Sequence, residues 1–269
     1  MVQRVIVQNV LIGGLAVVFG STHIVPHARE TGSIVAPAIS LVSGVVASGD
    51  TARATVAPTG AKVATALGAF ETVVRPLSHP NALADAFRSY FAYKSTHPDR
   101  VRKPYLYFVD YGLPSTSPRG YVFDMTSLRI VDGPFMVAHG RGSSVNKYGI
   151  PSRFSNAYGS NATSLGLYLA QETYGFRGKV GGRSYGSIGL KLQGVSTGYN
   201  DNARARRVVA HGAPYVTSRK AGRSEGCPAM EQARARRLLP ALANGAMVFL
   251  FAPNQKWLET DRWVNAATE

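Results

Sequence analysis

The chain has 269 residues, a net charge of +15 and a single cysteine. This length accommodates one large domain or two small ones, and an apolar content of 45% provides a sizeable core without disulfide support. One cysteine excludes an internal disulfide, and the charge points to an anionic partner, either nucleic acid or an acidic cell-envelope polymer.

The N-terminal segment has the layout of an export signal. Arg4 precedes a mostly apolar run over residues 10–19, which small residues follow. The run is short for a membrane span, and a buried N-terminal helix is the alternative. We predict that residues 1–30 are a signal peptide or membrane anchor, which places the protein in the periplasm or cell envelope.

Residues 31–78 are rich in small residues and proline, with few charges, and predict a low-complexity tether. Asn81 follows Pro80 and suits the N-cap of a helix. The apolar residues after it recur at helical spacing: Leu83, Phe87, Tyr90 and Phe91. The sequence therefore predicts an amphipathic helix that packs on the domain that follows.

From residue 104 onward the pattern changes to strands. Aromatic and β-branched segments such as "YLYFVDY" and "GAMVFLFAP" alternate with turn residues. One further helix is predicted, from Pro228 to about Leu242, and no strand–helix–strand repeat or glycine-rich phosphate loop appears. We predict a mainly β, mostly antiparallel domain over residues 79–254, followed by a C-terminal tail over residues 255–269.

The single cysteine, Cys227, immediately precedes Pro228, which suits the first position of a helix. At a helix N-terminus, free N–H groups and the helix dipole favour a thiolate. Lys220 and Arg223 add positive charge nearby. The sequence therefore predicts a nucleophile with a lowered pKa.

His211 ends the strand "RRVVAHG" and is followed by Gly212, which suggests a partly exposed position at the rim of the sheet. It reaches Cys227 if the loop over residues 213–223 folds back. The alternative is a satisfied histidine near a buried cysteine. Basic residues crowd the same region and indicate an acidic substrate, or else only a solvated face. Nucleic acid fits poorly because no reading motif is present.

Several motifs resemble a known family. His211-Gly212 and, sixteen positions after the histidine, the cysteine of Ser224-Glu225-Gly226-Cys227 resemble the signature of the YkuD-type L,D-transpeptidase catalytic domain. The segments "VAHGRGS" (137–143), "RFSNAYGSNATSLGLYL" (153–169) and "GRSEGC" (222–227) resemble the murein L,D-transpeptidase branch. Glu225 stands where the commoner pattern has histidine, a difference that bears on substrate specificity.

This resemblance implies a β-sandwich fold and cysteine-dependent acyl transfer on peptidoglycan stem peptides, with no metal or cofactor. Cys227 would be the nucleophile and His211 the base, with the Gly212 carbonyl or Ser224 orienting the imidazole. The N–H groups of Gly226 and Cys227 would form the oxyanion hole. The residues expected to line the substrate cleft are His139, Asn161 and Arg223.

Other functions fit parts of the pattern. Water as the acceptor would make the enzyme an L,D-carboxypeptidase, and a degenerate site would leave a cationic wall-binding module. Thiol peptidases of the papain type place the cysteine before the histidine, the reverse of the order here. A sortase-like enzyme shares the order, but the strand sequence typical of sortases is missing around Cys227.

Overall fold

The computed structural model describes residues 58–267. Its helices are α1 (Thr59–Phe70), α2 (Ala82–Thr96), α3 (Gln232–Leu242) and α4 (Gln255–Thr260), with a 3-10 turn at Arg141–Ser143. Its strands are β1 (Tyr105–Asp110), β2 (Gly120–Asp124), β3 (Arg129–Phe135), β4 (His139–Gly140), β5 (Gly166–Val180), β6 (Arg183–Gly194), β7 (Val209–Gly212), β8 (Arg223–Ser224), β9 (Ala229–Met230) and β10 (Met247–Phe251). The segment predicted as a signal or anchor lies outside the described residues.

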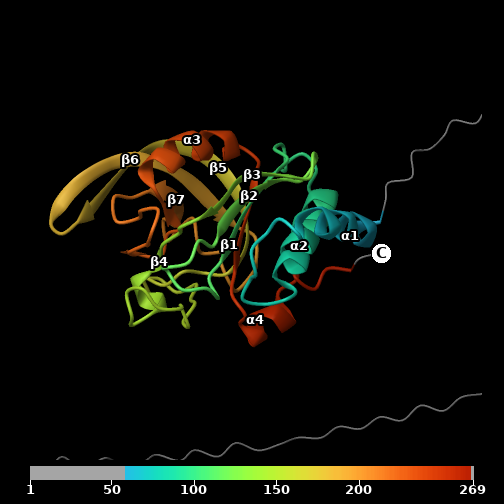
Figure 1. Ribbon diagram of the computed structural model, residues 1–269, viewed down its shortest axis with the longest axis horizontal. Helices are drawn as coiled ribbons and strands as arrows, with labels where there is room; N and C mark the ends of the chain where they lie inside the picture. The colour runs from blue at the N-terminus through green and yellow to red at the C-terminus, as the bar shows by residue number, and fades with distance from the viewer. Residues whose placement is uncertain (1–57, 268–269) are drawn as a thin grey trace, which may run out of the picture. The chain divides into compact units, whose positions relative to one another are not determined.

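Eight strands form one mixed sheet in the order β3-β2-β1-β10-β5-β6-β7-β9 (Figure 1). Most neighbours are antiparallel, but β1 and β10 run parallel, as do β7 and β9. Strands β4 and β8 form a separate two-stranded parallel sheet. The described part of the chain is therefore mixed α/β with dominant sheets, which corrects the prediction of a mainly β domain with two helices.

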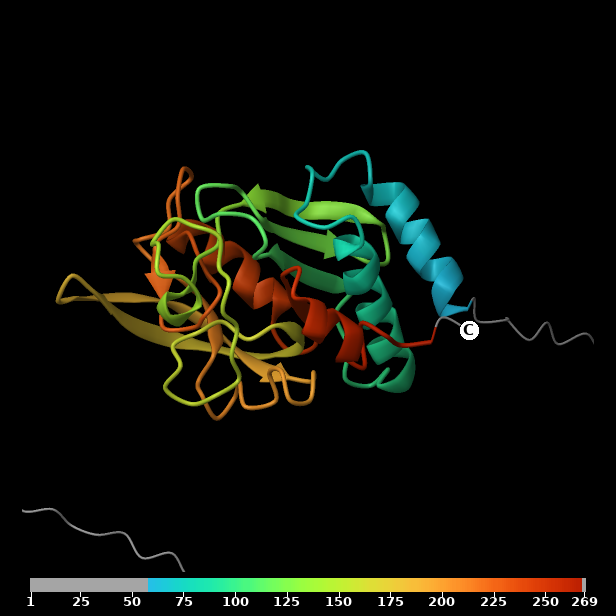
Figure 2. The same cartoon turned by 90° about the horizontal axis from the view of Figure 1, so that it is seen from below.

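Helices cover both faces of the sheet (Figures 1 and 2). On one face, Phe123 of β2 packs its ring against Phe70 of α1 and Phe87 of α2. On the other, Tyr107 of β1 stacks on Phe135, and the guanidinium of Arg234 from α3 lies over the same Phe135 ring. Because successive side chains of a strand point to opposite faces, β1 is buried on both sides.

Helix α1 lies inside the stretch predicted as a tether. Val63, Ala66 and Phe70 recur three and four positions apart, and all three are buried against the rest of the domain. Because mostly small residues separate them, this short helical periodicity was not recognised in the sequence. The other domain boundaries stay predictions.

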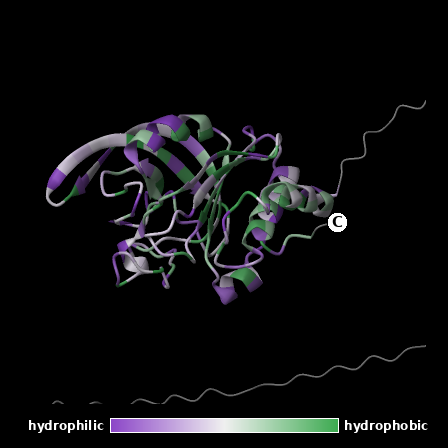
Figure 3. Cartoon of the chain, viewed as in Figure 1, coloured by the Kyte–Doolittle hydropathy of each residue, from purple (hydrophilic) through white to green (hydrophobic). Residues whose placement is uncertain are grey.

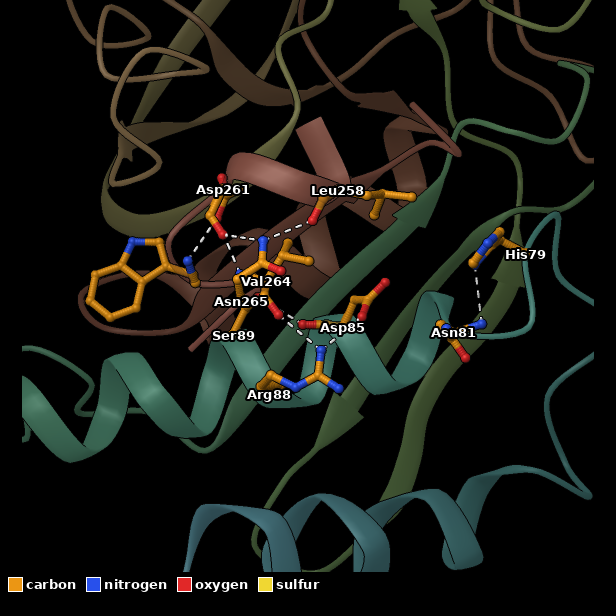
Figure 4. A network of polar contacts seen from close by, with 10 residues as sticks. His79, Asn81, Asp85, Arg88, Ser89, Leu258, Asp261, Val264 and Asn265 are labelled. Atoms are coloured by element: carbon orange, nitrogen blue, oxygen red, sulfur yellow. Dashed lines mark hydrogen bonds and ion pairs between the residues drawn. The ribbon is translucent and has the colours of Figure 1, made fainter. Parts of the chain in front are cut away.

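The C-terminal segment is also packed, although it was predicted as a tail (Figure 4). The Arg88 guanidinium of α2 donates to the carbonyl of Val264 at 2.9 Å, and the Asp261 carboxylate accepts from the indole N–H of Trp257. Trp263 in turn donates to the carbonyl of Val195. These contacts fasten residues 255–267 to α2 and to the end of β6.

None of the helices within residues 58–267 has the length and apolar character needed to cross a membrane.

Strands β5 and β6 continue beyond the sheet as a long hairpin. Figures 1 and 2 show it at the end of the domain opposite α1 and α2. Its outer part is largely exposed and carries hydrophilic residues (Figure 3), whereas β6 pairs with β7 at its base, with Gly189 opposite His211. The hairpin is therefore joined directly to the strand that carries His211.

Candidate active site

A tight loop between β8 and β9 carries Cys227. The Ser224 hydroxyl donates to the carbonyl of Cys227 at 2.6 Å and accepts from the N–H of Gly226 at 3.2 Å. Helix α3 begins only at Gln232, because Pro228 is followed by the two-residue strand β9 rather than by a first helical turn. The prediction that Cys227 lies at the N-terminus of this helix is therefore wrong, because the strand β9 separates the cysteine from α3.

Gly226 is required by the geometry of this loop. Its φ of +118° lies in a region that residues with a side chain rarely adopt. A Cβ at this position would also approach the carbonyl oxygen of Ala162 to 2.9 Å. The glycine before the cysteine in the sequence motif is thus explained by backbone conformation.

The Cys227 thiol faces backbone atoms of the segment before β7. Sγ lies 3.5 Å from the N–H of Val209 and 4.0 Å from the carbonyl of Arg207. Burial raises the pKa of the thiol to about 11, and this effect outweighs the N–H of Val209 and the charge of Arg206, which both act to lower it. The predicted lowering of the pKa is therefore wrong, and the resting group is a neutral thiol.

His211 is buried in β7, only 3% exposed, so the prediction of a partly exposed position at the rim is corrected. The Phe176 ring from the β5–β6 hairpin stacks on the imidazole, with ring centroids 4.1 Å apart and 18° between the planes. Nδ1 lies 3.1 Å from the carbonyl oxygen of Gly212, and a carbonyl can only accept, so Nδ1 carries the proton. Burial lowers the pKa of His211 to about 4, which leaves the imidazole neutral with Nε2 unprotonated.

Strand pairing brings the histidine and the cysteine loop together. β7 and β9 are parallel, with His211 opposite Ala229, and the His211 N–H donates to the carbonyl of Pro228. Within residues 58–267, Sγ and the imidazole form no direct hydrogen bond, and such bonds are often long before substrate binds. The fold therefore places the backbone of His211 beside the loop that carries Cys227.

The predicted oxyanion donors differ in availability. The N–H of Gly226 already donates to Ser224, whereas the N–H of Cys227 has no acceptor among the described residues. Ser224 shapes the cysteine loop and does not contact His211, so of the two predicted orienting groups only the Gly212 carbonyl touches the imidazole.

Arg206 is a site residue that sequence reasoning did not distinguish from its neighbours. Its guanidinium donates to the carbonyls of Ser155 and Ala162 and to the hydroxyls of Ser160 and Ser164. These four contacts fasten the loop over residues 155–164 against the cysteine loop, next to Gly226. In the sequence, the clustered arginines of "NARARR" gave no sign of which side chain points inward.

His139 is fully buried and does not line an open cleft, which corrects its predicted role. Arg119, itself fully buried, donates from Nη2 to Nδ1 of His139 at 3.1 Å, and Ser115 Oγ lies 2.9 Å from the same nitrogen. Nε2 must then carry the proton. Burial and the charge of Arg119 lower the pKa of His139 to about 3. His139 is thus held neutral in β4, opposite Arg223 of β8, and its buried Nε2–H has no hydrogen-bond partner among residues 58–267.

Asn161 and Arg223 also shape the loops around the cysteine. Asn161 adopts a left-handed conformation with a φ of +51°, and its side chain donates to the carbonyl of Gly159. Arg223 donates from Nη1 to the carbonyls of Ser144 and Val145, so its guanidinium is held by this loop. Neither residue is placed against Cys227 by these contacts.

The basic residues of the region divide into two groups. Arg234 and Arg237 pair with Asp132, and Arg206 is bonded to the 155–164 loop. The exposed cations without a carboxylate partner in the described part of the chain are Arg204, Arg207, Arg219, Lys220 and Arg236. Only part of the predicted basic surface is therefore available to an anion.

Solved structures similar to this chain are L,D-transpeptidases. One from Mycobacterium smegmatis shares 12% identity over 55% of this chain and 59% of that chain, with a TM-score of 0.33. One from Stackebrandtia nassauensis shares 15% identity over 64% and 66%, with a TM-score of 0.34. This chain thus spans about three-fifths to two-thirds of the length of these proteins. No curated protein matches it.

Because these identities and TM-scores are low, the family assignment rests on a family model. The model described as "L,D-transpeptidase catalytic domain" matches residues 76–251, which include His211, Ser224, Gly226 and Cys227. This match covers more than half of the 269 residues and confirms the resemblance seen in the sequence. The chain belongs to the L,D-transpeptidase catalytic domain family.

Proposed function

We propose that the protein transfers acyl groups between peptidoglycan stem peptides through a thioester at Cys227. The observation that carries the proposal is the parallel pairing of β7 with β9, which brings His211 to the cysteine loop with Nε2 free to accept a proton. Membership of the L,D-transpeptidase catalytic domain family supports the substrate class.

In the first half-reaction, Sγ of Cys227 attacks the carbonyl carbon of the third stem residue while Nε2 of His211 takes the thiol proton. The N–H of Cys227 donates to the oxyanion that forms. The C–N bond to the fourth residue then breaks, His211 returns the proton to the departing amine, and a D-amino acid leaves. The acyl group remains on sulfur as a thioester.

In the second half-reaction, the amine of another stem attacks the thioester. Its nitrogen loses a proton to His211, the C–S bond breaks, and the thiol is restored as the cross-link forms. Water in place of the amine would give L,D-carboxypeptidase activity from the same intermediate.

The protonation states determine how this chemistry proceeds. A thiol with a pKa of about 11 and an imidazole with a pKa of about 4 form no resting thiolate–imidazolium pair. The proton must therefore move during attack, or bound substrate must shift both pKa values. The same observation favours a second candidate, a wall-binding module without catalysis, in which the thiol stays inert.

We also propose the cellular context and the domain organisation. A cell-wall substrate requires export, which residues 1–30 would direct as a signal peptide or membrane anchor. Residues 31–58 would then connect that segment to the catalytic domain, and the strands of that domain would form the sandwich typical of the family.

Product analysis tests the proposed function. The purified protein is incubated with a disaccharide tetrapeptide, and the products are weighed by mass spectrometry. A cross-linked dimer indicates transpeptidation, and tripeptide with free D-amino acid but no dimer indicates carboxypeptidation. Unchanged tetrapeptide, together with sedimentation of the protein with isolated sacculi, would leave the binding module as the function.

A further inference from the structure

A cavity of about 340 Å³ shares two of its lining residues with the surroundings of the thiol, although Cys227 itself does not line it. Val209 and Arg207 both line it, and these are the residues whose N–H and carbonyl face Sγ of Cys227. Tyr174 from the β5–β6 hairpin lines the cavity as well. The cavity and the nucleophile are therefore separated by the backbone of Arg207 and Val209.

The wall of the cavity is cationic. Arg204, Arg207 and Lys191 line it, and no acidic residue does. Lys191 is paired with Glu172 at 2.7 Å, so most of its charge is already balanced. Arg204 and Arg207 have no carboxylate partner among residues 58–267, and both are exposed. Glu172 lies close enough to Arg204 for the arginine to lower the pKa of its carboxyl, so Arg207 is the cation of this wall that has no acidic neighbour among the contacts of residues 58–267.

Arg207 is also held in an unusual conformation. Its φ of +59° is in the left-handed region, which is uncommon for a residue other than glycine, asparagine or aspartate. Strained backbone of this kind is concentrated at functional sites. Here the conformation accompanies a carbonyl directed at Sγ and a side chain on the wall of the cavity.

We propose that this cavity is a carboxylate subsite, in which Arg204 and Arg207 bind the terminal carboxylate of the residue that leaves when the thiol attacks. The peptide nature of the ligand rests on the proposed function, whereas the carboxylate specificity rests on the cavity. Successive Cα atoms are about 3.8 Å apart, so a carboxylate one residue beyond the scissile carbonyl must bind next to the nucleophile. Guanidinium groups suit this ligand because they bind carboxylates through paired N–H donors.

The subsite can be tested without any transpeptidase activity. Iodoacetate and iodoacetamide alkylate a thiolate by the same displacement of iodide and differ in the carboxylate. The rate ratio of iodoacetate to iodoacetamide at Cys227 is measured by intact-protein mass spectrometry at low salt. We expect the ratio to fall roughly fivefold in Arg204→Gln/Arg207→Gln, because an exposed ion pair contributes up to about a factor of five.

Comparing the two reagents on one protein removes any general change in thiol reactivity, since a shifted pKa affects both rates alike. Arg236→Gln, an exposed arginine on α3 outside the cavity, is the matched control and should keep the wild-type ratio. A double variant with the wild-type ratio would overturn the subsite.

A second comparison uses tetrapeptide with a C-terminal acid or amide. The wild type should convert the acid more efficiently, and the ratio of the acid rate to the amide rate should fall toward one in the double variant. If alkylation depends on the two arginines but no tetrapeptide is converted, the subsite stands and the proposed function fails. Equal conversion of acid and amide by the wild type, with alkylation ratios alike in all variants, would overturn the subsite alone.

Discussion

Phe176 stacks on the imidazole of His211 with ring centroids 4.1 Å apart, although the two residues come from different parts of the chain. The β5–β6 hairpin supplies the phenylalanine and β7 the histidine. The stacked ring contributes to the burial that lowers the pKa of His211 to about 4. The hairpin thus helps to set the protonation state of the proposed base.

Replacing this ring should return the histidine toward its ordinary behaviour. We expect Phe176→Ala to raise the pKa of His211 from about 4 toward about 6.5, because water then reaches the imidazole and stabilises its charged form. NMR titration of the His211 ring protons measures the shift. Phe91→Ala, in a partly buried position on α2, is the control. A pKa that stays near 4 in Phe176→Ala would show that other groups bury the imidazole.

Gly226→Ala should damage the site through the backbone. A side chain at a φ of +118° costs about 1–3 kcal/mol, and its Cβ would press on the carbonyl of Ala162. We expect both a lower free energy of unfolding in urea and loss of activity, since the loop that positions Cys227 must move. Gly186→Ala is the matched control because its Cβ would meet nothing within 4 Å. Equal stability of the two variants would contradict the conformational argument.

Stability should fall on mild acidification because two histidines are buried in the neutral form. The pKa is lowered to about 4 at His211 and about 3 at His139, so the unfolded state binds more protons than the folded state below pH 6.5. Each histidine should then lower the free energy of unfolding by about 2 kcal/mol between pH 6.5 and pH 5.

Urea unfolding of His139→Asn at several pH values measures how much His139 contributes to the pH dependence of the free energy of unfolding. Asparagine retains an acceptor for Arg119 but cannot titrate. The variant should therefore lose about half of the pH dependence in that range. If acidification lowers the free energy of unfolding equally in the wild type and in His139→Asn, groups other than His139 cause the pH dependence.

Much of the site was predictable from the sequence, but its electrostatics were not. The spacing of His211 and Cys227 and the helix α2 (Ala82–Thr96) followed from local patterns. The raised thiol pKa did not, because it depends on burial by segments distant in the sequence. Pro228 also misled the prediction, since proline suits a helix start and a short edge strand alike. Arg119 and Arg206 gained their roles only through long-range contacts that no local pattern encodes.

Binding to the cell wall should depend on the exposed cations beyond the cavity. Arg219 and Lys220 are exposed and lack a carboxylate partner within residues 58–267. We expect Arg219→Gln/Lys220→Gln to weaken sedimentation with isolated sacculi at low salt and to have little effect at high salt, because the Debye length falls to about 8 Å at physiological ionic strength. If neither salt nor these substitutions affect binding to sacculi, the net charge of +15 serves to bind a partner other than the cell wall.

The central claim is that Cys227 forms a thioester with the stem peptide, and trapping this intermediate tests it most directly. The wild type is mixed with excess tetrapeptide whose acceptor amine is blocked by acetylation, quenched in acid and weighed as intact protein. We expect an added tripeptide acyl group on the wild type, on the order of 10² to 10⁴ slower accumulation in His211→Ala, and no adduct in Cys227→Ala. An adduct of the same mass on Cys227→Ala, or tetrapeptide turnover by that variant at the wild-type rate, would contradict it.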